Sequence, residues 1–229
     1  MKIRAIITDI EGTTTPISFV KEVLFPFSYD RMEEFLRENW ENPDVKKAID
    51  EVEKIEGKSL SFHEIVNTLR VWIKEDRKIT PLKQIQGMTW EGGYRSGNIT
   101  GPVYPDAYRK LKEWWEKGIK LYVYSSGSVK AQKLLFSHTD YGDITYLFSG
   151  YFDTTIGSKI EEDSYRRISQ CINLHPQEIL FLSDNPQEVL SASKTGMRVY
   201  RVVREGDAKW IEKFNNPQIR SFEEVDLFA

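Results

Sequence analysis

Apolar residues form short, largely unbroken runs at several places along the chain. The first is IRAIIT, residues 3–8, in which β-branched side chains predominate and no strict polar alternation occurs. A run of this length and composition is typical of a strand buried on both faces of a sheet. Similar runs, each next to a stretch with helical spacing, are IKLYVYS (119–125), ILFLS (179–183) and RVYRVV (198–203). This alternation predicts βα units and a doubly wound, Rossmann-like parallel sheet.

Turn and cap residues bound the helical stretches between these strands. In YPDAYRKLKEWWEKG, Pro105 suits the first helical turn and Gly118 suits the end. The apolar face of this helix comprises Ala107, Leu111 and either Trp114 or Trp115. In DNPQEVLSASKTG, Asp184 or Asn185 can cap a second helix that begins at Pro186.

Residues 17–98, between the first two predicted strands, have helical spacing and contain no convincing strand. The apolar positions of DVKKAIDEVEKI fall on one helical face: Val45, Ala48, Ile49, Val52 and Ile55. Ser61 and Glu64 have the spacing of a capping box before a second amphipathic stretch, and Thr80 and Pro81 begin a third. We therefore expect a block of helices here.

This block divides the chain into an α/β core, residues 1–16 and 99–229, and an inserted helical cap, residues 17–98. Open α/β sheets bind ligands at the carboxyl ends of their strands, so an insertion after the first strand is suited to act as a lid. The glycine-rich return WEGGYRSGNITGP, residues 90–102, fits either a second hinge or an ordinary surface loop.

Composition narrows the choice of partners. The 229 residues are 40% hydrophobic, and 32 basic residues nearly balance 35 acidic ones, which gives a net charge of −3. This balance offers no electrostatic reason to expect nucleic acid or an anionic membrane, so we expect a small-molecule partner. The single cysteine, Cys171, and the lack of a long apolar segment near the N-terminus favour the cytoplasm. His63, His138 and His175 lack the spacing of zinc ligands, so we expect them to be ordinary surface or core residues rather than a zinc site.

Two carboxylates, Asp9 and Glu11, end the first predicted strand in TDIEGTT, and Gly12 follows them. A sheet of the predicted type brings them to its ligand-binding edge. The alternative is that these acids only cap the next helix.

Three other candidate residues come from later motifs. In YSSGS, Ser125 and Ser126 can hold an anion or can simply form the turn. In GSKIEEDSY, the default interpretation of Lys159 is an exposed ion pair with Glu161 or Glu162.

The run FLSDNPQE adds Asp184 at a strand end and Glu188 about one helical turn later. Carboxylates around a hard dication, together with a lysine and hydroxyl groups, make a site for a phosphate group. In such a site the first acid, Asp9, can attack phosphorus.

The order of these motifs resembles the haloacid dehalogenase superfamily of aspartate-nucleophile phosphatases. The segments DIEGTTTPI, YSSGSVKAQKLLF, FDTTIGSKIEEDSY, ILFLSDNPQE and GMTWEGGY are similar to those of its enolase-phosphatases of methionine salvage, over nearly the whole chain. The resemblance implies an Asp9 nucleophile and one Mg²⁺ per subunit, bound by the carboxylates of Asp9 and Asp184 and by the Glu11 main-chain carbonyl.

The same resemblance implies that Ser125 and Ser126 hold substrate oxygens, that Lys159 stabilises the charge on the nucleophile and the transferred group, and that Glu188 supports Lys159 or the metal's waters. Glu11 stands where an aspartate usually acts as general acid and base. Its additional methylene extends the reach by about 1.5 Å, which suits a family that both enolises a diketone and removes its phosphate.

The implied reaction converts 2,3-diketo-5-methylthiopentyl 1-phosphate to 1,2-dihydroxy-3-keto-5-methylthiopentene and phosphate in a monomeric enzyme. Met88, Trp90 and Tyr94 are candidates to hold the methylthio group. The alternatives are a phosphatase for another small phosphorylated metabolite, a non-catalytic metabolite-binding protein, or a phospho-accepting receiver. A receiver is about half this length and carries its accepting aspartate on a later strand.

Overall fold

The computed structural model describes residues 2–227, which fold as two compact units. The α/β unit comprises the chain up to residue 19 and from residue 100 onward, and the helical unit comprises residues 20–99. Each has a hydrophobic core of its own. Among the described residues, no helix combines the length and the apolar character that crossing a bilayer requires.

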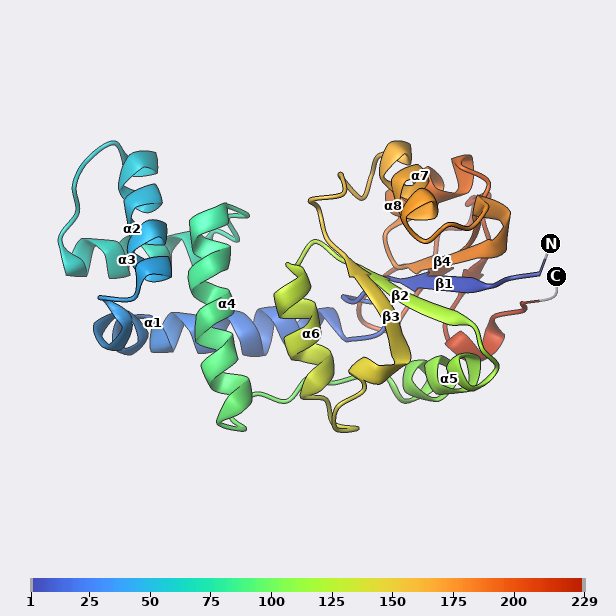
Figure 1. The fold of residues 1–229 in the computed structure, drawn as a ribbon, viewed down its shortest axis with the longest axis horizontal. Coiled ribbons are helices and arrows are strands. Elements are labelled where there is room, and N and C mark those ends of the chain that lie inside the picture. The colour runs from blue at the N-terminus through green and yellow to red at the C-terminus, as the bar shows by residue number, and fades with distance from the viewer. Residues whose placement is uncertain (1, 228–229) are drawn as a thin grey trace. The chain divides into compact units, whose positions relative to one another are not determined.

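The α/β unit contains a six-stranded, fully parallel sheet in the order β3-β2-β1-β4-β5-β6 (Figure 1). The strands are β1 (Ala5–Thr8), β2 (Lys120–Tyr124), β3 (Phe148–Phe152), β4 (Ile179–Ser183), β5 (Arg198–Val202) and β6 (Gln218–Ile219). Every residue of β1 and β4 is buried, as expected for strands covered on both faces. This topology confirms the predicted doubly wound α/β fold.

Four helices connect the strands: α5 (Pro105–Glu116), α6 (Val129–Ser137), α7 (Glu162–Cys171) and α8 (Pro186–Lys194). In Figure 1, α7 and α8 lie on one side of the sheet and α5 lies on the other. Trp114 is fully buried while Trp115 is exposed, so Trp114 belongs to the apolar face of α5. The cap of α8 is Asn185, whose side-chain oxygen accepts a hydrogen bond from the Gln187 N–H.

The four predicted strands correspond to β1, β2, β4 and β5, whereas the sequence pattern does not indicate β3 or β6. β3 has the sequence FSGYF, in which Ser149 and Gly150 interrupt the apolar run. Its residues after Phe148 are only partly buried or exposed, so no continuous hydrophobic signal arises. β6 has only two residues, and it pairs with β5 alone.

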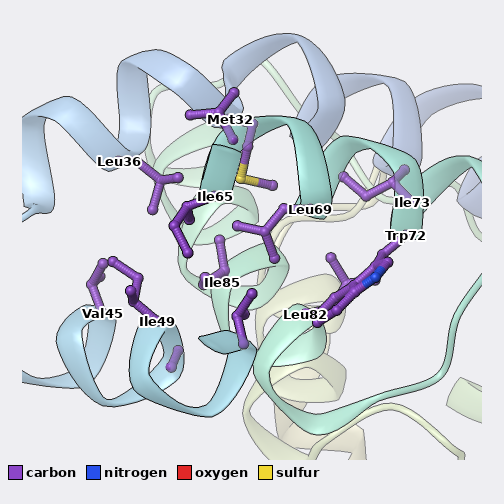
Figure 2. Close-up of a cluster of buried hydrophobic side chains, with 13 residues drawn as sticks. Met32, Leu36, Val45, Ile49, Ile65, Leu69, Trp72, Ile73, Leu82 and Ile85 are labelled. Atoms are coloured by element: carbon purple, nitrogen blue, oxygen red, sulfur yellow. The ribbon is translucent and has the colours of Figure 1, made fainter. Parts of the chain in front are cut away.

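The helical unit contains four α-helices: α1 (Phe25–Asn39), α2 (Pro43–Glu56), α3 (Phe62–Lys74) and α4 (Thr80–Arg95). A π-helical segment, Phe19–Leu24, precedes α1. Figure 2 shows the apolar side chains that these helices direct toward one another, among them Met32, Leu36, Val45, Leu69, Trp72 and Ile85. Both bonds of the Ser61–Glu64 capping box are present at the start of α3. Ile55, predicted on the buried face of α2, is 47% exposed because the buried stripe ends at Val52.

The sequence of residues 90–102 fits either a hinge or a surface loop, but residues 90–95 form the end of α4 and are therefore not loop. A hinge role for the rest of the segment stays a prediction. Gly93 lies in this part of α4 because its neighbours leave no room for a side chain. A Cβ at this position would lie 2.5 Å from Ile99 Cδ1 and 2.7 Å from Phe27 Cζ. This glycine therefore permits close packing within the helical unit rather than bending.

The chain leaves and re-enters the α/β unit at two points that are bonded to the same side chain. The Ile17 N–H and the Tyr104 hydroxyl both donate to Asp207 Oδ2, at 3.1 and 2.7 Å. The Tyr104 N–H also donates to the Thr14 carbonyl at 2.9 Å. The two crossings are thus fixed to each other on the α/β side.

Candidate active site

Asp9 is the first residue after β1, at the carboxyl edge of the sheet. Its N–H donates to the Leu182 carbonyl of the neighbouring strand β4 at 2.9 Å. Its carboxylate oxygen Oδ1 accepts the Ile10 N–H at 2.8 Å. The N–H groups of residues 13–15 all donate to the Ile10 carbonyl, so the chain turns tightly after Asp9. The Asp9 side chain is consequently buried and held in place.

Lys159 contacts Asp9 directly, and the surface interpretation of this lysine is wrong. Its Nζ lies 2.6 Å from Asp9 Oδ1 and 2.9 Å from Glu188 Oε2, and the residue is only 8% exposed. Glu161 and Glu162 are not its partners in the described contacts. The lysine follows β3, and because that strand was not recognised, nothing in the sequence pattern placed Lys159 near a strand end.

The charges around Lys159 favour its protonated form. Burial alone lowers the pKa of a lysine, but the charges and hydrogen bonds of Asp9 and Glu188 outweigh this effect and raise the pKa of Lys159 above its ordinary value. Burial and, to a smaller extent, repulsion from Asp9 raise the pKa of Glu188. The attraction of Lys159 opposes this rise but does not cancel it. The surroundings of Lys159 therefore favour the ammonium form.

Asp184 follows β4, the strand next to β1, and it brings another carboxylate to the same edge. Its N–H donates to Thr13 Oγ1 at 3.0 Å. Burial and the charge of Asp9 raise the pKa of the Asp184 carboxyl to about 7. Gly12, with φ of +68°, makes room for it, because a Cβ there would lie 2.8 Å from Asp184 Oδ2. Only glycine fits this approach without strain.

These residues fit a hard divalent cation. Within residues 2–227, no group of three or more His, Cys, Asp or Glu side chains has the arrangement of a metal site. The predicted ligand set needs only two such side chains, because it combines two carboxylates with one main-chain carbonyl. Asp9, Asp184 and Glu188 bring three carboxyl groups to a region with one ammonium, and the pKa of Asp184 is raised first by burial and then by the charge of Asp9. Oxygen ligands of this kind suit Mg²⁺ or Ca²⁺.

Ser125 and Ser126 lie at the same edge but differ in exposure. Ser125 is 4% exposed, donates its N–H to the Phe152 carbonyl at 3.1 Å, and accepts the Gly127 N–H on Oγ at 3.3 Å. Ser126 is exposed. They lie beyond β2, which pairs with β1, but no described contact joins either serine to Asp9. Their role as phosphate ligands stays a prediction.

Glu11 is exposed and forms an isolated β-bridge with Thr15.

Met88, Trp90 and Tyr94 lie on α4 of the helical unit, where the Trp90 indole N–H donates to the Leu24 carbonyl at 2.8 Å. Their proposed contact with the methylthio group stays a prediction.

Two residues that sequence reasoning did not identify support the site. Ser183 Oγ donates to Glu188 Oε2 at 2.8 Å and lies 3.3 Å from Asp9 Oδ2. The buried Arg204 donates from Nε and Nη2 to the Thr13 carbonyl, at 3.1 and 2.9 Å. Ser183 is detectable as the last residue of a predicted strand, directly before Asp184. Arg204 follows the last predicted strand, and no local pattern indicates that it reaches the first loop.

Comparison with known proteins agrees with this fold. A family model described as haloacid dehalogenase-like hydrolase matches residues 3–196. The chain is similar to the crystal structure of the UTR4 protein of Saccharomyces cerevisiae, with a TM-score of 0.83 and 33% identity over 97% of this chain and 100% of that one. A dehalogenase structure with a TM-score of 0.60 and 15% identity shares the fold alone. The chain belongs to the haloacid dehalogenase-like hydrolases and has their fold.

Curated relatives named enolase-phosphatase E1 are more similar in sequence. Those of Sulfurihydrogenibium sp. (strain YO3AOP1) and Aquifex aeolicus (strain VF5) are 58% and 55% identical, over 98% of this chain and 98% and 100% of their own lengths. The chain belongs to the enolase-phosphatase E1 family. This membership makes it a phosphatase and implies a divalent metal ion and a small phosphorylated substrate.

Proposed function

We propose that this protein is the Mg²⁺-dependent enolase-phosphatase of methionine salvage. It converts 2,3-diketo-5-methylthiopentyl 1-phosphate to 1,2-dihydroxy-3-keto-5-methylthiopentene and phosphate. The observation that carries the proposal is the buried Lys159 ammonium that bridges Asp9 and Glu188, with the Asp184 carboxyl nearby. This arrangement combines a nucleophile, a fixed cation and an excess of negative charge that suits a metal ion.

The contacts of Asp9 distinguish its two carboxylate oxygens. Oδ1 accepts hydrogen bonds from Lys159 and from the Ile10 N–H. Among residues 2–227, Oδ2 has only the longer contact with Ser183, at 3.3 Å. Oδ2 is therefore the oxygen suited to attack phosphorus, forming an aspartyl-phosphate as the ester P–O bond breaks. Water then hydrolyses the aspartyl-phosphate, which releases phosphate and restores Asp9. Lys159 stabilises the negative charge in both steps.

The enolase step removes a proton from carbon 1 of the substrate before the P–O bond breaks. Glu11 is the proposed acid and base, because it follows the nucleophile by two residues and is exposed at the carboxyl edge. Asp9, Asp184 and the Glu11 carbonyl would hold the metal. A bound Mg²⁺ would neutralise phosphoryl oxygens and polarise the substrate carbonyls.

The deciding experiment is a rapid-mixing time course with the diketo phosphate and Mg²⁺. Ultraviolet absorbance follows the conjugated enol, and phosphate is measured in the same quenched samples. We expect the enol to form before the phosphate or together with it. Phosphate released with saturated diketo alcohol would instead support a phosphatase for another small phosphorylated metabolite.

The nucleophile is tested with Asp9→Asn, because an amide is a poor nucleophile and a weak metal ligand. We expect no phosphate release from this variant. The control is Asp163→Asn, which removes an exposed carboxylate of α7 and should keep wild-type turnover. Wild-type turnover in Asp9→Asn would exclude the proposed mechanism.

We also propose that the enzyme is a cytoplasmic monomer. The single cysteine suits a reducing compartment, and the monomer is what the family resemblance implies. Light scattering at the concentration of the kinetic assay should give the mass of one chain. The mass of a dimer would refute the monomer.

A further inference from the structure

The segment that carries Lys159, residues 157–160, lies between β3 and α7 and is held by side-chain hydroxyl groups. Each of its four main-chain carbonyls accepts a hydrogen bond from a different hydroxyl. We call these four donors the hydroxyl cradle: Tyr124 to Gly157 O at 2.9 Å, Ser164 to Ser158 O at 2.7 Å, Tyr165 to Lys159 O at 2.6 Å, and Ser191 to Ile160 O at 2.6 Å.

The donors of the cradle are all buried, and they come from three different elements, β2, α7 and α8. Connecting segments usually satisfy their carbonyls with water, whereas this one is satisfied by the protein interior. Position 157 in this environment requires glycine. Its φ is +143°, and a Cβ there would lie 2.2 Å from Ser164 Oγ. The path of the segment is therefore fixed on both sides of Lys159.

Tyr165 is the donor that bonds the carbonyl of Lys159 itself. Its ring is fully buried and packs edge-on against Tyr124 and Phe181, with centroid distances of 5.6 and 5.0 Å. This packing determines where the hydroxyl lies. Lys159 is thus fixed at both ends, at its main chain by Tyr165 and at its ammonium by Asp9 and Glu188.

A lysine side chain has many rotamers, so the position of its charge depends on the position of its backbone. We propose that the Tyr165 hydroxyl is a positioning group that sets the place of the Lys159 ammonium beside the nucleophile. Tyr165 acts through Lys159 and is not a catalytic residue. The inference rests on the proposed function, because it assigns Lys159 a part in the reaction.

The test is Tyr165→Phe, which keeps the packed ring and removes only the hydroxyl. The matched control is Tyr200→Phe, which removes a hydroxyl that bonds the Asp226 carbonyl at an exposed position. We expect kcat for phosphate release to fall about tenfold to hundredfold in Tyr165→Phe, because small misplacements of a charged group have effects of this size. KM should change much less, and Tyr200→Phe should behave like the wild type.

A double-mutant cycle separates positioning from a general loss of structure. Tyr165→Phe is introduced into wild type and into Lys159→Arg, and single turnovers with excess enzyme keep slow variants measurable. We expect a large loss of rate in wild type and little further loss in Lys159→Arg, where the charge is already displaced. Near-ultraviolet circular dichroism checks the fold. If Tyr165→Phe does not fold, Ser191→Ala replaces it with the same expectations.

Equal losses in the two backgrounds, or a Tyr165→Phe enzyme as fast as wild type, would overturn the proposal. Failure of the proposed function is a different result, because wild type and Tyr200→Phe alike would then release no phosphate from the diketo substrate, or would release it with saturated diketo alcohol.

Discussion

Lys159 lies between two carboxylates, so the loss of its charge affects both catalysis and folding. In Lys159→Met we expect phosphate release to fall by orders of magnitude. In metal-free buffer the free energy of unfolding should fall by about 3 kcal/mol, because Asp9 and Glu188 lose the cation between them. Urea unfolding and the phosphate assay measure the two effects.

The control for Lys159 is Lys194→Met, which breaks an ion pair with Glu162 in which the lysine side chain is 63% exposed. Lys194→Met should lower the free energy of unfolding by less than about 1 kcal/mol and leave turnover normal. If both variants had the same small effects, Lys159 would have to be regarded as an ordinary structural residue.

A substitution at Gly12 tests whether Asp184 is a ligand of the metal, because the two residues are in close contact. In Gly12→Ala the new Cβ would press on Asp184 Oδ2, so we expect the Mg²⁺ concentration for half-maximal activity to rise about tenfold or more. EDTA should abolish wild-type activity, and added Mg²⁺ should restore it.

Gly118→Ala is the matched control, since Gly118 has a φ of +79° and no atoms within 4 Å of the added Cβ. Both variants should lose about 1 kcal/mol of stability from the left-handed conformation. Only Gly12→Ala should need more Mg²⁺, and an unchanged Mg²⁺ requirement would argue against Asp184 as a ligand.

Much of this site could be predicted at the residue scale, because Asp9 and Asp184 directly follow apolar runs. Lys159 could not be placed on the same grounds. Acidic neighbours in its own sequence favoured a local ion pair, whereas its partners, Asp9 and Glu188, are distant in the sequence and close only in the folded sheet. Composition and spacing do not report such contacts.

At the scale of elements, Asp106 in the first turn of α5 connects this helix to the C-terminal part of the α/β unit. Its Oδ2 accepts hydrogen bonds from Arg204 Nη1 at 2.8 Å, from Ser221 Oγ at 3.0 Å and from the Phe222 N–H at 2.8 Å. Burial favours a higher pKa, but these bonds and the charge of Arg204 outweigh it and lower the pKa of Asp106. The ionised form therefore stabilises the fold.

The sign of the pH effect follows from that lowered pKa. The contribution of Asp106 is fully present above its unfolded pKa of about 3.9, and it is lost as the pH falls through the lower folded pKa. We expect Asp106→Asn to be less stable than wild type by about 2 kcal/mol at pH 7. The difference should shrink below pH 4, as measured by urea unfolding. A difference that is constant from pH 7 to pH 3 would contradict the assignment.

The strands that sequence analysis recognised are those with continuous apolar runs, and β1 and β4 are the fully buried examples. β3 is a true strand whose pairing with β2 determines its conformation, although Ser149 and Gly150 interrupt its pattern. Tertiary pairing, rather than local propensity, explains this strand. The helices of residues 25–95 were easier to detect because caps and amphipathic spacing are local properties.

At the scale of the whole molecule, the separate cores predict that the α/β unit folds without the helical unit. We expect a variant in which a short Gly/Ser linker replaces residues 20–99 to unfold cooperatively in urea, with the near-ultraviolet spectrum of a packed core. We also expect it to lose turnover of the diketo substrate. The intact chain is the reference, and an aggregated or non-cooperative product would show that the α/β unit depends on the insertion.

The shared hydrogen bonds of Ile17 and Tyr104 to Asp207 have an evolutionary consequence. Because the chain departs and returns at neighbouring points, recombination could exchange the helical unit and leave the strand order of the α/β unit unchanged. If Asp9 is the nucleophile, as we propose, such an exchange would offer a route to new substrate preferences with the same chemistry.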